Sequence, residues 1–523
     1  MRRLLLLILV GFAVSLTSCR NDFEFESSTG NLRFSKDTVY LDTVFTNIGS
    51  STYTLKVYNK SDKNISIPKV QLAKGEASKY RMMVDGIPGK VFDDVELLAK
   101  DSMFIFVEVT ANVIDANTTD FLYTDQILFG EGSNTQKVEL VTLIQDAYFI
   151  YPGRVQNPDE SYTYDELDLG LDGDGNPVTI RGRFLEESNP MNGNELHWTN
   201  EKPYVVYGYA AVPSNKTLVV DAGARVHFHA ESGLIVANNA SIHVNGTHST
   251  TPDLENEVIF EGDRLEPDFS EVPGQWGTIW LTQGSTNNQL SNLTIKNATV
   301  GILVSGNDGT PSPTLALENT QIYNCSNVGI LARTGNIEGK NLVINKCGQA
   351  SFAGSFGGSY EFVHCTFANY WSRPNQTAVA LDDFIQTSSG YIIEPLTKAN
   401  FKNCIIYGSS NLGINLQKRG TSTAFNYNFD HCLLKFIDYN NALSSNPLYQ
   451  FSNTNLYTSC LIATNSSINK PDFENPTNNL LRIGENSAAK GTAKTQYSTF
   501  NDLLNQNRTS PTDMGAYNWT LFN

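Results

Sequence analysis

At 523 residues the chain is too long for one ordinary hydrophobic core, so two or more domains or a repeat array are expected. Its formal net charge of −17 and the absence of a stripe of lysines and arginines exclude a nucleic-acid-binding surface, because phosphates need clustered cations. With 17% charged residues, 39 glycines and many Asn, Ser and Thr residues, the composition favours β-structure over helical bundles.

The amino terminus predicts export. Two arginines precede an apolar run, Leu4 to Leu16, that is shorter than the roughly 20 residues of a membrane-spanning helix, so residues 1–18 are expected to be a signal peptide. The run ends in Leu-Thr-Ser-Cys, which resembles a bacterial lipobox and implies that Cys19 is lipidated and becomes the first residue of the mature protein. At about 0.8 kcal/mol for each buried CH₂, two or three acyl chains would anchor the protein to a membrane. The alternative is an ordinary signal peptide followed by an incidental cysteine.

Residues 19–31 are predicted to form a polar tether. The residue after the cysteine is Arg20, not aspartate, which resembles the sorting pattern of outer-membrane lipoproteins, and the acidic residues that follow are similar to surface-export signals of Bacteroidetes lipoproteins. The resemblance implies attachment to the outer membrane, at the cell surface or on the periplasmic face. A plain tether without an export signal is the alternative.

Residues 32–147 alternate apolar and polar positions with a period of two, which predicts an immunoglobulin-like (Ig-like) β-sandwich. Strand length and β-branched or aromatic residues mark five segments: Thr38–Phe45, Tyr53–Asn59, Asn64–Leu72, Ser102–Val109 and Gln136–Ile144. This domain is expected to be a spacer or docking module. Residues 148–203 are expected to connect it to the next domain and to cap that domain's N-terminal end.

A short phrase recurs at variable spacing between residues 295 and 460, and it predicts that residues 204–523 form a parallel β-helix. Ile295–Val304 (IKNATVGILV) has a near-copy at Ile322–Ala332 (IYNCSNVGILA), where an apolar residue stands three positions before a small one. Six of the seven cysteines occupy the small position: Cys325, Cys347, Cys365, Cys404, Cys432 and Cys460. A fixed phrase separated by loops of different length is typical of a solenoid, whose coils stack about 4.8 Å apart.

Their shared place in the repeat predicts that these cysteines are buried free thiols in one interior ladder, with stacked amides at Asn324 and Asn403 beside them. Disulfide bridges are the alternative, because an even number of cysteines in an exported protein usually means bridges. A second marker follows at Gly301, Gly329 and Gly413, where glycine is expected to let the backbone turn without a Cβ clash.

The rung Gly274–Leu281 (GQWGTIWL) resembles those of Bacteroidetes surface lipoproteins in the pectate-lyase-like superfamily. Ser510–Trp519 (SPTDMGAYNW) is similar to a closing motif of these proteins, with Met514 in place of isoleucine. The resemblance implies an all-β chain: a right-handed parallel β-helix (solenoid) preceded by the Ig-like β-sandwich, with a C-terminal cap near Trp519.

Superfamily members include pectate lyases and polygalacturonases, so carboxylates on the flank of the β-helix are candidate catalytic residues. Asp382 and Asp383 (VALDDFIQ) are similar to the paired aspartates of polygalacturonase-like enzymes, although that family's Gly-His-Gly and Asn-Thr-Asp phrases are missing. The alternative is that one aspartate caps a corner of the backbone. A second acidic loop, with Asp263 and Glu266, is expected to be a solvated turn.

One loop and one strand carry candidate metal ligands. Asp172, Asp174 and Asn176 (LDGDGNPV) resemble the first half of an EF-hand loop, but proline and arginine stand where its glycine and glutamate belong. An EF-hand is therefore excluded, and a looser calcium site or a Gly-rich turn remains. His227 and His229 share one face of a strand with no third ligand placed beside them, so both are expected to be outward-facing residues without a metal.

The favoured function is non-catalytic: a lipid-anchored binding, adhesion or envelope module whose β-helix binds a polysaccharide or another surface protein. The competing hypothesis is a polysaccharide lyase or glycoside hydrolase acting in a groove on the flank. A purely structural envelope protein is not separable from the first hypothesis by sequence. Calcium is the one cofactor that the sequence leaves open.

Overall fold

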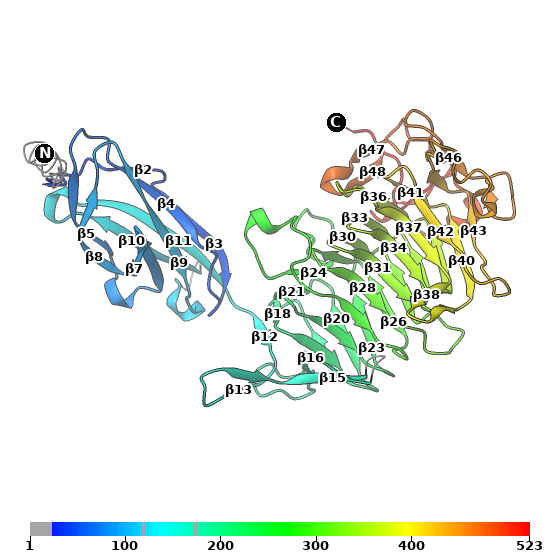
Figure 1. Ribbon diagram of the computed structural model, residues 1–523, viewed down its shortest axis with the longest axis horizontal. Coiled ribbons are helices and arrows are strands. Elements are labelled where there is room, and N and C mark those ends of the chain that lie inside the picture. Colours follow the sequence, from blue (N-terminus) through cyan, green and yellow to red (C-terminus); the bar gives the residue numbers. More distant parts are fainter. Residues whose placement is uncertain (1–23, 118–120, 172–174, 523) are drawn as a thin grey trace, which may run out of the picture. The chain divides into compact units, whose positions relative to one another are not determined.

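The computed structural model describes residues 24–117, 121–171 and 175–522, which belong to two compact units divided between Asp146 and Ala147 (Figure 1). Regular structure in these residues consists of β-strands and short 3₁₀ helices. No helix within the described ranges has the length and apolar character needed to cross a membrane. The all-β fold class, a parallel β-helix preceded by an Ig-like β-sandwich, is confirmed.

The first unit is the β-sandwich. One sheet has the order β1-β5-β10-β11-β3, with β8 beside β5, and the other has the order β2-β4-β9-β6-β7. Most pairs are antiparallel, but β1 runs parallel to β5 and β3 parallel to β11. The strands are β1 Glu26–Ser27, β2 Arg33–Phe34, β3 Thr38–Phe45, β4 Tyr53–Tyr58, β5 Ile65–Leu72, β6 Tyr80–Val84, β7 Ile87–Gly89, β8 Val91–Leu97, β9 Ser102–Val109, β10 Leu122–Phe129 and β11 Gln136–Gln145.

Alternating burial along the strands forms the sandwich core, as the period of two predicts. In β9, for example, Met103, Ile105, Val107 and Val109 are buried, while Phe104 and the other intervening side chains are more exposed. The five predicted strands correspond to β3, β4, β5, β9 and β11. The predicted tether boundary at residue 31 is wrong, because β1 already pairs with β5.

The second unit is the β-helix, whose three sheets stack successive coils in parallel register (Figure 1). The first sheet contains β12 Tyr148–Ile150, β18 Tyr204–Val206, β21 Arg225–Phe228, β24 Val258–Gly262, β27 Leu293–Lys296, β30 Gln321–Cys325, β33 Val343–Cys347, β36 Thr366–Asn369, β41 Ile405–Gly408, β44 Leu433–Lys435 and β46 Leu461–Ala463.

The second sheet contains β15 Glu166–Leu171, β16 Pro177–Phe184, β19 Tyr209–Val212, β22 Gly233–Val236, β25 Ile279–Leu281, β28 Val300–Val304, β31 Val328–Arg333, β34 Ala350–Ser355, β37 Thr377–Asp382 and β42 Ile414–Gln417. The third contains β17 His197–Trp198, β20 Thr217–Asp221, β23 Ser241–Asn245, β26 Asn288–Ser291, β29 Leu315–Glu318, β32 Asn336–Lys340, β35 Gly358–Val363, β40 Leu396–Lys402, β43 Asn428–Asp430 and β45 Tyr457–Thr458. Outside them lie the hairpins β13 Arg154–Gln156 with β14 Tyr162–Tyr164, β38 Phe384–Thr387 with β39 Gly390–Ile393, and β47 Phe473–Asn475 with β48 Leu480–Ile483.

The β-helix begins earlier than residue 204. Strands β12, β16 and β17 pair in parallel with β18, β19 and β20 of the following coil. The region 148–203, expected to be a connection and cap, therefore supplies the first coil. The hairpin formed by β15 and β16 interrupts that coil, so its residues do not match the repeated phrase.

The six repeat cysteines are free thiols, but they form two stacks and not the single ladder expected. Cys325 pairs in register with Cys347 at the end of first-sheet strands. The other four lie at the corner where the third sheet turns into the first, immediately before the paired positions Thr366, Ile405, Leu433 and Leu461. Each of these four follows a residue with positive φ: His364 (53°), Asn403 (52°), His431 (52°) and Ser459 (50°). Polar residues tolerate this left-handed conformation, so they mark the corner in every coil.

Residues 470–522, here called the C-terminal strap, lie along the outer face of the first sheet (Figure 1). Leu481, Leu503 and Met514 pack against apolar side chains that the first sheet points outward, such as Val343 and Ile405. The predicted cap near Trp519 is therefore wrong in its placement, because the closing motif covers the side of the coils. Outward apolar residues need this cover to be buried.

Side-chain amides at the corners tie the strap to the coils. The side chain of Asn345 donates to the backbone oxygen of Pro476 (2.8 Å), and that of Asn341 donates to the backbone oxygen of Asn501 (2.9 Å). The expected hydrogen bond between stacked amides occurs at Asn324, whose side chain donates to that of Asn297 in the preceding coil (3.4 Å). The equivalent partner of Asn403 is the ring of His364. The contacts between the strap and the coils at Asn341 and Asn345 join residues more than a hundred positions apart.

Candidate functional site

The outer surface of the third sheet carries a polar residue at the same place in most of its coils. The register aligns Gln289 of β26 with Ala316, then Glu338, Glu361, Asn400 and Asn428. These residues point outward because their neighbours in each strand, such as Ile337 and Phe362, are buried in the core. We call the outward row Gln289, Glu338, Glu361, Asn400 and Asn428 the polar face.

The polar face contains both neutralised and free groups. Glu361 forms ion pairs with Lys402 (2.7 Å) and Lys398 (3.3 Å). Burial alone would raise the pKa of Glu361, but hydrogen bonds and charge from the two lysines outweigh it and hold the pKa below its usual value. Glu338 is exposed and has no ion pair in the described part of the chain, and the side-chain amide of Asn400 makes no hydrogen bond there. Both are available to a ligand.

One end of the polar face is closed by a charged cluster. Asp430 accepts hydrogen bonds from His431 (2.6 Å), from the strap residue Tyr497 (2.5 Å) and from Lys494 (3.1 Å). Burial would raise the pKa of Asp430, but these partners hold it below its usual value. The carboxylate is fully engaged, so it contributes structure to the end of the face.

Asp382 and Asp383 lie in consecutive positions but reach different coils. Asp382 accepts hydrogen bonds from the backbone of Phe356 (2.8 Å) and from the hydroxyl of Ser355 (3.3 Å), in the preceding coil. Asp383 is buried, and its two oxygens accept the backbone N–H groups of Arg419 (2.7 Å) and of the following glycine (2.9 Å), in the next coil. The pair therefore ties three coils together, and the corner-capping alternative describes both residues.

The electrostatics of this pair follow from that role. Burial raises the pKa of Asp382, and the backbone hydrogen bonds oppose the shift. An acid–base pair would need lone pairs or a proton directed at a ligand. Here Oδ1 of Asp382 and both oxygens of Asp383 accept backbone N–H groups, and only Oδ2 of Asp382 is without a hydrogen bond among the described residues.

The two candidate metal-binding histidines, His227 and His229, lie next to carboxylates of the following coil. His227 is buried, contrary to the expectation of an outward-exposed side chain, and its Nδ1 lies 3.9 Å from Glu261. His229 is exposed and bonds through Nδ1 to Asp263 (2.7 Å). Arg264 stacks on an aromatic ring of the same loop. Within the described ranges, no group of three or more His, Cys, Asp or Glu side chains is arranged to hold a metal ion.

Three predicted site residues, Cys19, Asp172 and Asp174, lie outside the described residues. The calcium candidate Asn176 follows them in the turn between β15 and β16, next to Gly175, whose φ is +85°.

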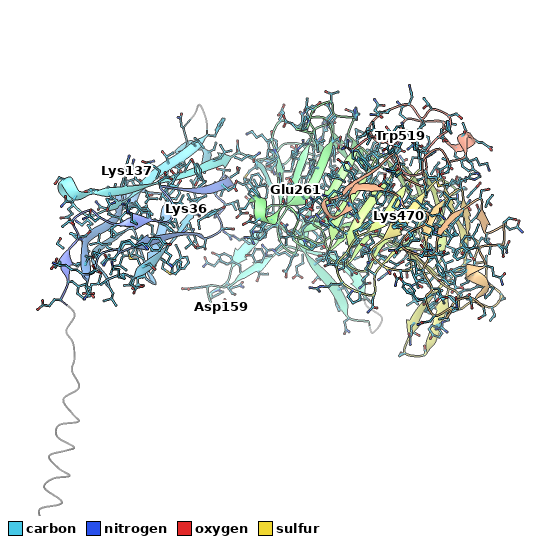
Figure 2. The ribbon with its side chains drawn as sticks, turned by 90° about the horizontal axis from the view of Figure 1, so that it is seen from above. Lys36, Lys137, Asp159, Glu261, Lys470 and Trp519 are labelled. Carbon is cyan, nitrogen blue, oxygen red and sulfur yellow. The ribbon has the colours of Figure 1, made fainter. Side chains whose placement is uncertain are left out.

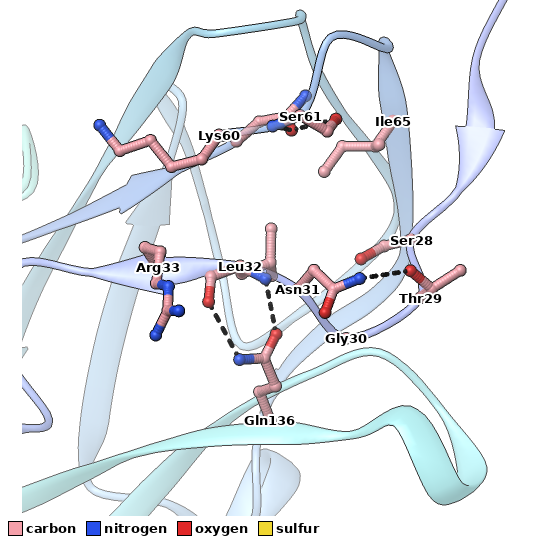
Figure 3. Close-up of a pocket in the computed structure, with 11 residues that line it drawn as sticks. Ser28, Thr29, Gly30, Asn31, Leu32, Arg33, Lys60, Ser61, Ile65 and Gln136 are labelled. Carbon is pink, nitrogen blue, oxygen red and sulfur yellow. Dashed lines mark hydrogen bonds between the residues drawn. The ribbon is translucent and has the colours of Figure 1, made fainter.

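A polar pocket of about 430 Å³ lies in the β-sandwich, between the β1–β2 loop and the start of β5 (Figure 3). Gln136 bonds to both backbone groups of Leu32, and Asn31 bonds to Thr29. These side chains hold the loop in place, which leaves few groups free for a ligand.

Sequence reasoning missed the polar face. The third-sheet strands LALE, NIEGK, SYEFV and KANFK carry the signal, because aligning their buried residues puts Ala316, Glu338, Glu361 and Asn400 at one position. The repeated cysteine phrase aligns a different part of each coil, around cysteines that are mostly buried.

Comparison with known proteins gives no family. No family model and no curated protein matches the chain. Among solved structures it is similar to the periplasmic chaperone SfaE (10% identity, 29% of this chain and 83% of that one, TM-score 0.14) and to the E. coli chaperone DraB (10%, 33% and 96%, TM-score 0.16). A family 123 glycoside hydrolase from Clostridium perfringens also matches (5%, 43% and 74%, TM-score 0.14). Similarities at this level carry nothing about function.

Proposed function

We propose that this protein is a lipoprotein of the outer membrane whose β-helix binds an extended polysaccharide along the polar face without cleaving it. The polar face is the observation that carries the binding proposal. Five polar side chains, two of them carboxylates and three of them amides, project from one row of the third sheet. Successive coils are about 4.8 Å apart, so Glu338, Glu361, Asn400 and Asn428 offer hydrogen-bonding groups in four consecutive coils along a chain of hydroxyl-bearing rings, and Gln289 follows beyond Ala316.

Multivalent contact supplies the affinity in this proposal. A single amide–hydroxyl hydrogen bond contributes only about 1 kcal/mol net. Several such contacts on one rigid surface add to each other because the second and later ones form within the same complex. Catalysis at Asp382 and Asp383, the alternative function, has less support, because three of their four carboxylate oxygens accept backbone hydrogen bonds.

Two further parts of the proposal, the lipid anchor at Cys19 and the superfamily, rest on the sequence alone. The Leu-Thr-Ser-Cys phrase supports lipidation of Cys19. The rung GQWGTIWL and the closing motif SPTDMGAYNW support membership of the pectate-lyase-like superfamily, as a surface lipoprotein of the Bacteroidetes type.

The binding proposal is tested with the chain from Arg20 onward, which contains every described residue. It is run through gels that contain acidic or neutral polysaccharides, and each polysaccharide is assayed for new reducing ends and unsaturated products, with and without calcium. We expect retardation by at least one polysaccharide with no product. The double variant Glu338→Ala with Asn400→Ala should weaken that retardation at least tenfold.

The matched control is Asn415→Ala, which removes an exposed amide from the second sheet. It should bind as the unchanged protein does. New products would overturn the proposal in favour of an enzyme, and equal binding by the double variant would overturn the polar face as the site. Retention by no polysaccharide would move the function to a protein partner.

The anchor is tested by metabolic labelling with an alkyne fatty acid in a Gram-negative host. The unchanged protein should carry the label and sediment with outer membranes, and Cys19→Ala should lose both. Label retained by the Cys19→Ala variant would contradict lipidation at this residue.

A further inference from the structure

A second concavity, of about 370 Å³, opens between the first sheet and the C-terminal strap. Two successive coils contribute to its floor, because Tyr407 of β41 and Lys435 of β44 lie side by side at one outward position of the first sheet. We call this cavity the Tyr–Lys pocket.

Aromatic rings form its walls. Tyr370 lies beside Phe473 of the strap, with ring centroids 6.1 Å apart and an interplanar angle of 77°. The hydroxyl groups of Tyr370 and Tyr407 have no hydrogen-bond partner among the described residues. Burial raises the pKa of both side chains, so both hydroxyls stay protonated and can donate.

Lys435 places an ammonium group in the pocket. The carboxylate of Asp472 also lines the pocket, but it accepts the backbone N–H of Asn486 (3.1 Å) and forms no ion pair with Lys435. The Nζ of Lys435 donates to the backbone oxygens of Gly408 (2.7 Å) and Ser409 (3.4 Å) and lies 5.2 Å from the centre of the Tyr407 ring. It forms no ion pair within the described chain, and burial lowers its pKa. A half-buried cation is costly unless an anion accompanies it. Lys470, on the strap beside the pocket, adds a second positive charge (Figure 2).

We propose that the Tyr–Lys pocket binds a single sugar ring that carries an oxyanion: a carboxylate, a sulfate ester or a phosphate ester. The aromatic walls pack against the faces of the ring, the two tyrosine hydroxyls bond to its hydroxyl groups, and Lys435 pairs with the oxyanion. The sugar part rests on the proposed glycan-binding function, and the oxyanion part rests on the unpaired ammonium. The pocket lies on the first sheet, so it is a different site from the polar face.

The test is NMR titration of the chain from Arg20 onward with methyl glucuronide, glucose 6-sulfate, glucose 6-phosphate and neutral glucose. At least one charged sugar should bind at least tenfold more tightly than glucose, and the three arms show which oxyanion is preferred. Lys435→Met should abolish that preference, and Tyr407→Phe should weaken binding several-fold. The matched control Lys340→Met, on the third sheet, should leave it unchanged.

Saturable binding of none of the charged sugars would overturn the proposal, and so would an unchanged preference in Lys435→Met. If that variant does not fold, acylation of Lys435 in the unchanged protein replaces it as the readout. The bound sugar should slow acylation of Lys435 but not of Lys340, and equal protection of both would overturn the site. Failure here, with polysaccharide still bound at the polar face, removes the Tyr–Lys pocket alone and leaves the proposed function standing.

Discussion

The β-sandwich and the β-helix bury their apolar side chains in different ways. In the sandwich, neighbours in space come from distant parts of the chain: β10 pairs with β5, so that Ile127 meets Leu72. In the β-helix, each side chain stacks on its equivalent one coil away, as Phe401, Phe429 and Tyr457 do at centroid distances of 4.9 and 5.5 Å. The β-helix therefore tolerates loops of different length between its strands, whereas each strand of the sandwich must pair with particular partners.

The C-terminal strap is the exception within the β-helix. It closes contacts between residues as far apart as Asn345 and Asn479, as a sandwich does. Because the strap and the first coil depend on individual long-range contacts, substitutions there should destabilise the β-helix more than substitutions on the exposed surface of its repeated coils. Four substitutions test this, in order of expected effect.

The largest effect is expected at the first coil. Glu195 has a fully buried side chain that forms an ion pair with Arg183 (2.5 Å). Glu195→Ala would leave the guanidinium without its counter-charge, at a cost of about 3–5 kcal/mol in the free energy of unfolding. Urea unfolding measures this cost. The control Glu187→Ala removes an exposed pair with Lys216 and should cost under about 1 kcal/mol; equal costs would contradict the prediction.

Gly515 in the strap is next. Its φ is +89°, and an added Cβ would lie 2.7 Å from Cδ1 of Ile405 and 2.9 Å from the hydroxyl of Thr366. Gly515→Ala should therefore cost about 3 kcal/mol, from backbone strain together with overpacking. Gly309→Ala is the control, because φ is +76° but no atom lies within 4 Å. It should cost about 1 kcal/mol, and a cost equal to that of Gly515→Ala would show that the strap is loosely packed.

Asp383→Asn removes one acceptor from the tie between coils. The side-chain amide can accept one of the two backbone N–H groups but would direct its own N–H groups at the other. We expect a loss of about 2 kcal/mol in the free energy of unfolding. Polysaccharide binding should be unchanged, and loss of binding without loss of stability would contradict the structural role of this aspartate.

The smallest effect is expected from pH, at His364 under the strap. Nε2 of His364 accepts from the amide of Asn403 (2.9 Å), whose orientation is fixed by its bonds to the backbone of Lys494, so the neutral ring is the form that fits. Burial, and then the charge of Arg508, lower its pKa well below the usual value. The folded state therefore binds this proton less tightly than the unfolded state does.

It follows that the contribution of His364 is present above the unfolded pKa of about 6.5 and is lost as the pH falls, by about 1.4 kcal/mol per pH unit. His364→Asn should remove this slope, because asparagine occupies the equivalent corner at Asn341 and Asn403. Urea unfolding between neutral and mildly acid pH compares the two proteins. Identical slopes would contradict the role of His364.

Local patterns predicted much of both units. The alternation of apolar residues located β3 and β9 to the residue, and the repeated cysteine phrase located the coils. Strands β8 and β10 were missed for opposite reasons. β8 is largely exposed and carries two aspartates, while β10 buries Asp125, which accepts a hydrogen bond from Ser78 and so breaks the apolar pattern.

The candidate site was less predictable. The polar face follows from the register of the third sheet, which an alignment of its strands would have shown. The Tyr–Lys pocket needs the strap, whose contacts with the coils have no signal in local sequence. Asp382 and Asp383 were found by their chemistry, but their hydrogen-bond partners lie in neighbouring coils, which sequence spacing does not reveal.

Binding of a polysaccharide along the polar face is tested most directly by carbodiimide labelling of carboxylates, read by mass spectrometry, with and without the polysaccharide that the protein retains. Glu338 is exposed and unpaired, so it should be labelled in the free protein and protected in the complex, while Glu187 is labelled equally in both and the polysaccharide keeps its length. Unchanged labelling of Glu338 at saturation, or a shortened polysaccharide, would contradict non-catalytic binding at this face.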